Sequence, residues 1–259
     1  MPSRIQIEED KVTTIWLNRP DVRNAMDEQM ITELTTAFHD AGDNQNVRAI
    51  ILRGRGKSFC AGADLNYMKS IAEFGFDENV KDAQKLAALF QTVYLCPVPT
   101  IAMVHGAAFG GANGLLAACD IVIAEENTKF AFSEVKLGIA PATISPFVIR
   151  RIGEYGAREL MVTGKRFNAR EALKWKLVNH VTEESTFEQM MEEIVQHILS
   201  AGPVAVRETK QLIRQVDASN PVEELMKHTA QMIARLRGSA EGREGMSSFL
   251  EKRKPKWMD

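Results

Sequence analysis

The chain has 259 residues, of which 45% are hydrophobic and 25% charged, a balance typical of one large globular domain or of a core with an appendage. Its formal net charge of -2 gives no overall field that favours nucleic acid or an anionic membrane, so we expect neither as a partner. No stretch approaches the roughly 20 apolar residues of a membrane span.

Cysteine usage and the N-terminus indicate the compartment. The chain has three cysteines, Cys60, Cys96 and Cys119, which form no CxxC pair. An odd number without pairing argues against a disulfide framework or a zinc site. Because the N-terminal residues also lack the apolar run of a signal peptide, we expect a reducing, cytoplasmic compartment.

The first half of the chain alternates strand-like and helix-like segments. Residues 12–17 (VTTIWL) are β-branched or aromatic and indicate a strand, whereas apolar residues recur at helical spacing from Asp27 to Ala41. The further predicted elements are strands at 49–52, 100–104 and 120–124 and helices at 80–94 and 112–119. This alternation predicts an α/β fold with mostly parallel strands.

After Arg150 the strand signals fade and helical patterns dominate. The predicted helices are residues 157–163, 169–176, 187–199, 204–215 and 221–236. We interpret residues 1–195 as an α/β core and residues 196–259 as a helical region, packed partly on the core and partly on a neighbouring subunit.

Two turns of small residues follow predicted strands. One is Cys60-Ala61-Gly62-Ala63-Asp64 and the other is Gly106-Ala107-Ala108-Phe109-Gly110-Gly111, which opens a predicted helix. Such turns can aim unpaired backbone N–H groups at an incoming oxygen, and glycine or alanine lets that oxygen approach closely. Two turns facing each other would form an oxyanion hole. Each turn alone is equally compatible with an ordinary tight connection.

The order and spacing of these motifs resemble the crotonase superfamily, the enoyl-CoA hydratase/isomerase family. The resemblance covers nearly the whole chain and rests on LNRP at 17–20, FCAGADL at 59–65, PVPT at 97–100, HGAAFGG at 105–111, ACD at 118–120, FSEVKLG at 132–138 and FLEKR at 249–253. Within the family, GAAFGGANGL and SEVKLGIAPATISPFV most resemble bacterial methylglutaconyl-CoA hydratases of leucine breakdown. The resemblance implies a superhelix of ββα units with a C-terminal helical region that builds trimers or hexamers.

The resemblance also implies roles for particular residues. The oxyanion donors would be the N–H groups of Ala63 and Gly111, and the proton carrier would be Glu134. Coenzyme A would enter as the thioester substrate, and no metal or redox cofactor is expected. The residues expected to contact CoA are Arg23, Ala25, Ala61, Asp64 and Leu65. Phe249 and Lys252 of the last helix are also expected to contact it, from an adjacent subunit.

One position departs from the family pattern. Many hydratases of the superfamily place two glutamates around one water, and the first would fall at Gly114 here. A single carboxylate can take a proton from water and return it to the enolate, or it can move a proton between Cα and Cγ, which is isomerase chemistry. We predict hydration of a branched, dicarboxylic enoyl-CoA such as 3-methylglutaconyl-CoA and keep an enoyl-CoA isomerase as the alternative.

Other readings remain open. A glutaconyl group carries a second carboxylate, for which Tyr67, Lys69, Thr143 and Ser145 are candidate partners. Asn113 is either a water-orienting group or an ordinary polar neighbour on a helix, and His105 fits a packed, hydrogen-bonded residue better than a catalyst. A protein that binds a CoA thioester or RNA without turnover is the alternative of another class, although the near-neutral charge argues against RNA.

Overall fold

A computed structural model describes residues 2–216 and 221–258. Its larger sheet has six strands in the order β1 (Ile5–Glu8), β2 (Val12–Leu17), β3 (Ala49–Gly54), β4 (Thr100–Val104), β6 (Ile121–Glu125) and β9 (His180–Thr182). Only the β1–β2 pair is antiparallel. The α/β class is therefore confirmed, with most strands parallel as the alternating pattern indicated.

A smaller sheet lies beside the larger one and carries one of the two turns. It consists of β5 (Ala107–Phe109), β7 (Lys129–Ala131) and β8 (Arg166–Asn168), with β5 and β7 parallel and β7 and β8 antiparallel. The strands β8 and β9 lie in the region where only helices were predicted. Each has three residues, too few to show an alternating pattern.

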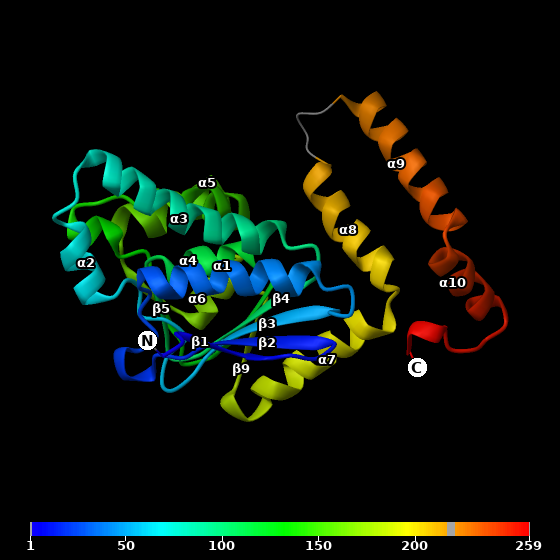
Figure 1. Cartoon of the computed structure of the whole chain (residues 1–259), viewed down its shortest axis with the longest axis horizontal. Coiled ribbons are helices and arrows are strands. Elements are labelled where there is room, and N and C mark those ends of the chain that lie inside the picture. Colours follow the sequence, from blue (N-terminus) through cyan, green and yellow to red (C-terminus); the bar gives the residue numbers. More distant parts are fainter. Residues whose placement is uncertain (1, 217–220, 259) are drawn as a thin grey trace.

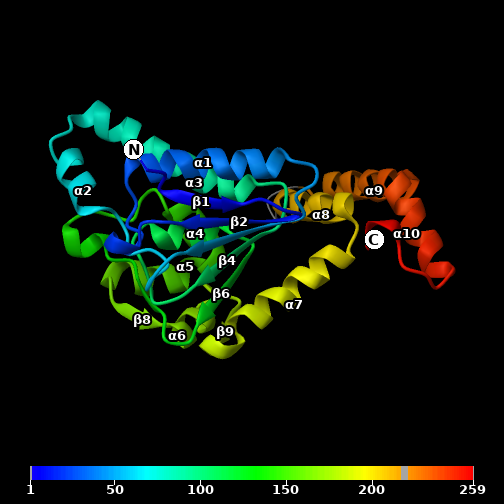
Figure 2. The same cartoon turned by 60° about the horizontal axis from the view of Figure 1, so that its bottom comes forward.

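Helices cover both faces of the large sheet (Figures 1 and 2). One face packs against α1 (Glu28–Asp43), α3 (Phe76–Leu95), α4 (Ala112–Ala118) and α5 (Ser145–Thr163), and the other against α7 (Phe187–Ser200). In β3, Ile50 and Leu52 face the first group, whereas Ile51 faces α7. Side chains of a strand alternate between faces, so a strand buried on both sides is a continuous apolar run.

Shorter elements complete the core. They are α2 (Leu65–Ile71), α6 (Ala169–Lys174) and the 3-10 turns Pro20–Val22, Glu134–Leu137, Glu184–Thr186 and Lys256–Met258. Helix α2 was not predicted, and α5 begins twelve residues before the predicted 157–163 helix, with a kink at Gly153. The predicted division after residue 195 falls within α7, whose Phe187 and Val195 pack on the sheet.

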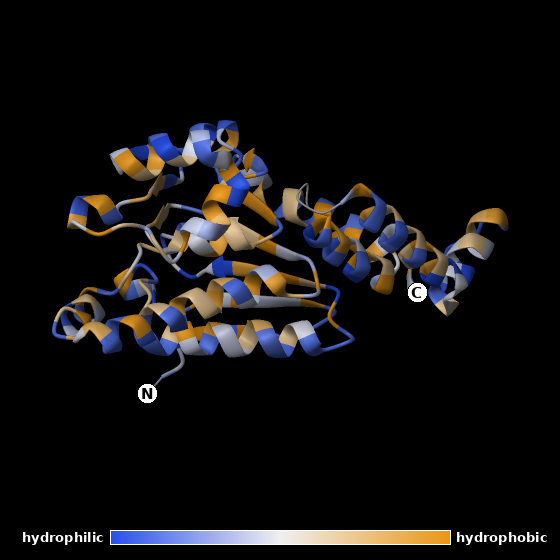
Figure 3. Cartoon of the chain, turned by 90° about the horizontal axis from the view of Figure 1, so that it is seen from above, coloured by the Kyte–Doolittle hydropathy of each residue, from blue (hydrophilic) through white to orange (hydrophobic). Residues whose placement is uncertain are grey.

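The C-terminal helices α8 (Pro203–Gln215), α9 (Val222–Gly238) and α10 (Ala240–Leu250) extend away from the sheet (Figure 1). They expose large apolar side chains among their polar ones (Figure 3), including Ile213, Met226 and Phe249 at 72%, 67% and 83% exposure. Among the described residues, no helix is long and apolar enough to cross a membrane.

Cationic side chains of α8 attach it to the core. Arg207 donates to the carbonyls of residues 42, 44 and 47, and Arg214 donates to the carbonyl of Tyr94. The buried Lys210 donates to the Val98 carbonyl at 2.8 Å and pairs with Asp120 at 2.6 Å. These three residues lie at helical spacing, so one face of α8 contacts the core mainly through main-chain acceptors.

Candidate active site

The first donor turn, residues 60–64, leaves the N–H of Ala63 unpaired. Met26 lies alongside this turn: its N–H donates to the Gly62 carbonyl at 2.8 Å, and its carbonyl accepts from the Asp64 N–H at 2.8 Å. In a trans peptide the N–H points opposite to the carbonyl, so the Ala63 N–H points away from Met26. Within residues 2–216 and 221–258 it has no hydrogen-bond acceptor.

The second donor turn, residues 106–111, presents the N–H of Gly111 at the start of α4. The Gly110 carbonyl accepts the Asn113 N–H at 2.9 Å, so the Gly111 N–H of the same peptide points out of the helix end. No acceptor for it exists in the described part of the chain. Gly110 has a φ of 54°, a left-handed conformation that favours glycine.

A short backbone pairing joins the two donor turns. The Cys60 N–H donates to the Ala107 carbonyl at 3.0 Å, and the Cys60 carbonyl accepts from Phe109 at 3.1 Å, so Cys60 and Ala108 form a parallel bridge. Ala63 and Gly111 each follow their bridge residue by three positions. The two free N–H groups therefore leave the same end of one paired segment, as an oxyanion hole requires.

Glu134 lies beside the second donor turn, at the start of a 3-10 turn just after β7. A methyl group at Gly110 would lie 3.5 Å from its Oε1 atom. Its Oε2 atom is buried and has no partner among the described residues. Burial raises the pKa of the Glu134 carboxyl above its ordinary value, which suits a group that both takes and returns a proton.

Apolar side chains fill the space next to Gly114. A Cβ atom at this position would lie 2.5 Å from Ile144 Cγ2 and 2.8 Å from Phe90 Cζ. Real Cβ atoms do not approach other atoms so closely, so the described chain has no room for a second glutamate there. Met26 and Phe90 also lie against Gly111, with Met26 Cε 2.9 Å from the position of an added Cβ. Apolar side chains therefore border the Gly111 donor.

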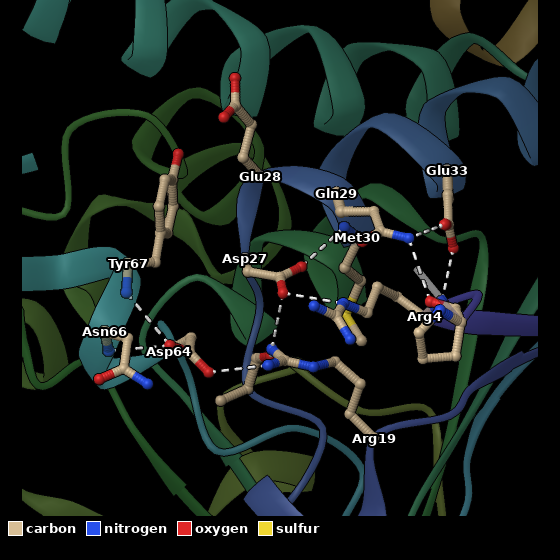
Figure 4. A network of polar contacts seen from close by, with 12 residues as sticks. Arg4, Arg19, Asp27, Glu28, Gln29, Met30, Glu33, Asp64, Asn66 and Tyr67 are labelled. Carbon is tan, nitrogen blue, oxygen red and sulfur yellow. Dashed lines mark hydrogen bonds and ion pairs between the residues drawn. The ribbon is translucent and has the colours of Figure 1, made fainter. Parts of the chain in front are cut away.

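A charged network holds the first donor turn (Figure 4). Arg19 donates to the Ala25 carbonyl at 2.5 Å and to Asp64 Oδ2 at 2.9 Å, and its guanidinium lies 3.2 Å from Asp27 Oδ2. The other oxygen of Asp27 caps α1 through the Met30 N–H, at 2.9 Å. Arg19 thus connects the starts of two helices, α1 and α2, on either side of the Met26 pairing.

Asp64 has a structural task in this network. Its Oδ1 accepts the N–H groups of Asn66 and Tyr67 at 2.8 and 3.1 Å and caps α2. Burial opposes ionisation, but these two hydrogen bonds and Arg19 outweigh it and lower the pKa of the Asp64 carboxyl. The Asp64 carboxylate is therefore occupied by the protein itself, and its N–H and carbonyl are paired with Met26 and Met68. The contact of Asp64 with CoA stays a prediction.

The other predicted CoA residues divide into two groups. Arg23, Ala25, Ala61 and Leu65 lie in the two paired segments, where the Ala61 N–H donates to the Arg23 carbonyl at 3.0 Å. Leu65 is 75% exposed. In contrast, Phe249 lies in α10 and Lys252 lies just after this helix. Helix α10 is at the opposite end of the molecule from α2 (Figure 1). The contribution of Phe249 and Lys252 from an adjacent subunit stays a prediction.

The candidate partners for a second substrate carboxylate have different hydrogen bonds in the structure. The Tyr67 hydroxyl donates to Asp82, and burial followed by this hydrogen bond and the charges of Asp82 and Glu28 raises the pKa of Tyr67. Tyr67 is therefore an unsuitable partner for an anion. Ser145 donates to the Ala142 carbonyl at 2.8 Å.

Asn113 and His105 form hydrogen bonds to main-chain carbonyls. The Asn113 side chain donates to three of them, which does not place it toward a reacting water. His105 Nε2 lies 2.9 Å from the Gly56 carbonyl oxygen, in keeping with a structural residue. Among the described residues, no group of three or more His, Cys, Asp and Glu side chains is arranged to hold a metal ion.

Sequence reasoning missed two residues near the site. Arg19 was quoted only as part of a motif, because its partners Asp27 and Asp64 lie 8 and 45 positions away. Ile144 was likewise quoted only as part of a motif, and nothing in its local pattern places it against Gly114. The glycine at 114 is the one available signal, since it implies close packing or a missing side chain.

Comparisons with known proteins agree with this geometry. The family model described as enoyl-CoA hydratase/isomerase matches residues 8–259. A putative enoyl-CoA hydratase of Thermus thermophilus is 34% identical over 98% of this chain and 100% of the relative. A crotonyl-CoA hydratase of Syntrophomonas wolfei is 33% identical over 95% of this chain and 94% of its own length.

Solved structures give the same result. A putative enoyl-CoA hydratase/isomerase (crotonase) from Legionella pneumophila superposes with a TM-score of 0.93 at 42% identity, covering 98% of this chain and 99% of the other. An enoyl-CoA hydratase from Shewanella pealeana superposes with a TM-score of 0.94 at 38% identity. The match covers 98% of this chain and 96% of the other. The crotonase-like fold is thereby confirmed, and the chain belongs to the enoyl-CoA hydratase/isomerase family of enzymes.

Proposed function

We propose that this enzyme adds water across the 2,3 double bond of an enoyl-CoA, with Glu134 as its acid–base group. The observation that carries the proposal is the half-buried Glu134 carboxyl, with one unpaired buried oxygen, beside the turn that presents the Gly111 N–H. The relatives named crotonyl-CoA hydratase and short-chain-enoyl-CoA hydratase support this reaction type.

One carboxylate is sufficient for both proton transfers of the proposed reaction. The thioester carbonyl accepts hydrogen bonds from the N–H groups of Ala63 and Gly111. Glu134 takes a proton from water as the oxygen of that water bonds to C3, and the electron pair of the double bond moves to the carbonyl oxygen. Glu134 then returns the proton to C2. The two N–H groups stabilise the negative charge, and loss of one such donor typically lowers the rate about 100- to 1000-fold.

The acyl group that we propose is branched and dicarboxylic, as in 3-methylglutaconyl-CoA. Its support is the resemblance of residues 106–115 and 133–148 to hydratases of that substrate, and the apolar Phe90 and Ile144 suit a methyl branch. Thr143, next to Ile144, and the exposed Lys69 remain candidates for binding the second carboxylate. We also propose a homotrimer or hexamer, supported by the exposed apolar residues of α8, α9 and α10.

An enoyl-CoA isomerase is the second candidate. The filled space at Gly114 favours the isomerase, because the protein then lacks the second carboxylate with which many hydratases orient the water. With a 3-enoyl-CoA, the same Glu134 carboxylate would take a proton from C2 and return it to C4, so that the double bond moves from C3–C4 to C2–C3. The two reactions differ in mass balance, since an isomerase product has the mass of its substrate.

The test uses three thioesters: 3-methylglutaconyl-CoA, crotonyl-CoA and a 3-enoyl-CoA. We expect loss of the conjugated enoyl absorbance with the first, a product heavier by one water, and abolition of both by Glu134→Gln. Glu126→Gln, at an exposed carboxylate near the end of β6, is the matched control and should retain activity. Turnover of the 3-enoyl-CoA alone, without a gain of mass, would replace the hydratase by the isomerase.

A further inference from the structure

Asn113 is the single polar side chain of α4, whose sequence is otherwise alanine, glycine and leucine. The residue is fully buried. Burial of an amide is unfavourable unless hydrogen bonds replace those that it made with water. An asparagine at this position therefore needs a reason other than packing.

The Asn113 amide contacts two separate segments. Its Nδ2 atom lies 2.9 Å from the Ala131 carbonyl oxygen and 3.3 Å from those of Ala108 and Gly110. Ala108 and Gly110 belong to the second donor turn, whereas Ala131 is the last residue of β7. One NH2 group thus connects the turn to the neighbouring strand.

Each segment carries one member of the proposed catalytic apparatus. The Gly110 carbonyl and the Gly111 N–H share one planar peptide, so a hydrogen bond that fixes the carbonyl also fixes the direction of the N–H. Ala131 precedes Glu134 by three residues, and its carbonyl also accepts the Gly110 N–H at 2.9 Å. The position of the donor relative to the carboxylate therefore depends on this junction.

The carbonyl oxygen of the Asn113 amide does not contribute to stability. Asn113 Oδ1 is buried and has no hydrogen-bond partner among the described residues. An unpaired buried acceptor opposes folding, whereas the hydrogen bonds from Nδ2 to three carbonyls favour it. These two contributions oppose each other, so the loss of Asn113 should change stability much less than it changes the catalytic rate.

We infer that Asn113 is a positioning residue: its amide sets the Gly111 N–H and the Glu134 carboxylate at fixed relative positions for the reaction. The inference rests on the proposed function, because a thioester substrate is what gives the N–H and the carboxylate a common task. Small displacements of reacting groups are costly, and about 1 Å can lower a rate 100-fold.

The decisive variant is Asn113→Leu, which keeps the branched shape and removes both polar atoms. We expect kcat to fall about 10- to 100-fold and KM to change by less than about threefold. The urea midpoint should change little, because the loss of the hydrogen bonds and the removal of the unpaired oxygen have opposite effects. Thr13→Val is the matched control, because it removes a buried hydroxyl of β2 that donates to the Asp10 carbonyl at 3.0 Å, outside both donor turns. It should lower the urea midpoint and leave kcat unchanged.

A spectroscopic measurement separates positioning from general damage. Hydrogen bonds from the two N–H groups lower the carbonyl stretching frequency of bound butyryl-CoA, a saturated thioester, labelled with 13C at its carbonyl. In Asn113→Leu, and in the smaller Asn113→Ala if the leucine variant does not fold, we expect this frequency to return toward its value in solution. Folded variants with wild-type kcat and wild-type frequency would overturn the inference. A wild-type protein that neither turns over thioesters nor shifts the band would overturn the proposed function first.

Discussion

The two donor turns are held by different interactions. Charges hold the first: Arg19 joins Asp27 and Asp64, whose side chains are 16% and 8% exposed. A neutral amide holds the second, since Asn113 is fully buried and its NH2 group donates to three main-chain carbonyls. The Asn113 amide binds the carbonyl of the very peptide whose N–H is left free, whereas in the first turn the Met26 N–H has that place and the charges hold the residues on either side.

The difference follows from location. The first donor turn lies among partly exposed residues, where ions keep part of their hydration and hydrogen bonds between oppositely charged groups are stabilising. It is also the segment predicted to contact CoA, whose phosphates are anionic, and Arg19 offsets the two aspartates there. Asn113, which holds the second turn, lies in α4, whose residues are all buried, and an unpaired ion there would be far more costly than an amide. We therefore expect only the first turn to respond to pH and salt.

The largest effect should come from Gly62→Val, which breaks the pairing between the turns. Gly62 has a φ of 103°, and a Cβ atom there would lie 3.2 Å from the Phe109 carbonyl oxygen. We expect kcat/KM to fall about 100- to 1000-fold, as for loss of an oxyanion donor, and stability to fall by about 1–3 kcal/mol. Steady-state kinetics and urea unfolding measure the two effects.

Gly153→Val controls for backbone strain in this comparison. Its φ of 73° is also left-handed, but nothing lies within 4 Å of an added Cβ. It should lower stability and leave kcat/KM within about twofold. Equal losses of activity in both variants would show that strain alone, and not the pairing of the donor turns, explains the result for Gly62.

Arg19→Met should have an intermediate effect. It removes the cation that pairs with Asp64, whereas Asp27 keeps Arg4 at 2.9 Å, and hydrogen bonds to charged groups contribute about 1.5–3 kcal/mol each. We expect a loss of that order in the free energy of unfolding and about a tenfold loss in kcat/KM. Arg158→Met removes a pair with Glu154 in which both side chains are more than 70% exposed, and should change stability by less than about 1 kcal/mol. Similar losses in the two variants would contradict the special role of Arg19.

The smallest effects are those of pH on stability. The pKa of Asp64 is lowered in the folded protein, so its contribution is fully present above the unfolded value and is lost as pH falls through the folded value. Asp64→Asn should therefore flatten the acid side of the stability curve. Urea midpoints of both proteins measured from neutral to acid pH test this, and parallel curves would refute it.

Glu134 should behave in the opposite sense. Its pKa is raised by burial, so ionisation opposes folding and the protein loses some stability as pH rises through the unfolded value toward neutrality. At neutral pH, Glu134→Gln should be inactive yet equally stable or more stable. The acid limb of kcat/KM in the wild type should lie above pH 4.5, the ordinary value for this carboxyl. A less stable Gln variant would argue for a structural role.

Much of this site follows from local sequence. The two donor turns, the glutamate after β7 and the alternation of strands and helices each depend on neighbouring residues. The alternation is confirmed, and the roles of Ala63, Gly111 and Glu134 stay a prediction. Leu65 and Ala61 likewise lie beside Ala63 because they adjoin it in the chain. Local pattern also predicted α8 and α9 to within two residues at each end.

The remainder depends on contacts between distant segments. No spacing rule brings Phe90 and Ile144 together over Gly114, or Tyr67 to Asp82. The assignment of Asp64 to CoA overlooked its role as the cap of α2, since α2 itself has seven residues and gives little helical signal. The strands β8 and β9 exist because they pair with β7 and β6, not because of their own composition.

The attachment of α8 has a consequence for divergence among related chains. Arg207 and Arg214 bind main-chain carbonyls, which every residue type provides, and Lys210 adds a single side-chain partner, Asp120. Substitutions at positions 42, 44, 47 and 94 can accumulate without removing these acceptors. The C-terminal helices should therefore be exchangeable between homologues whose α8 keeps the three cations and whose core keeps the aspartate, which makes this junction a natural crossover point for chimaeric enzymes.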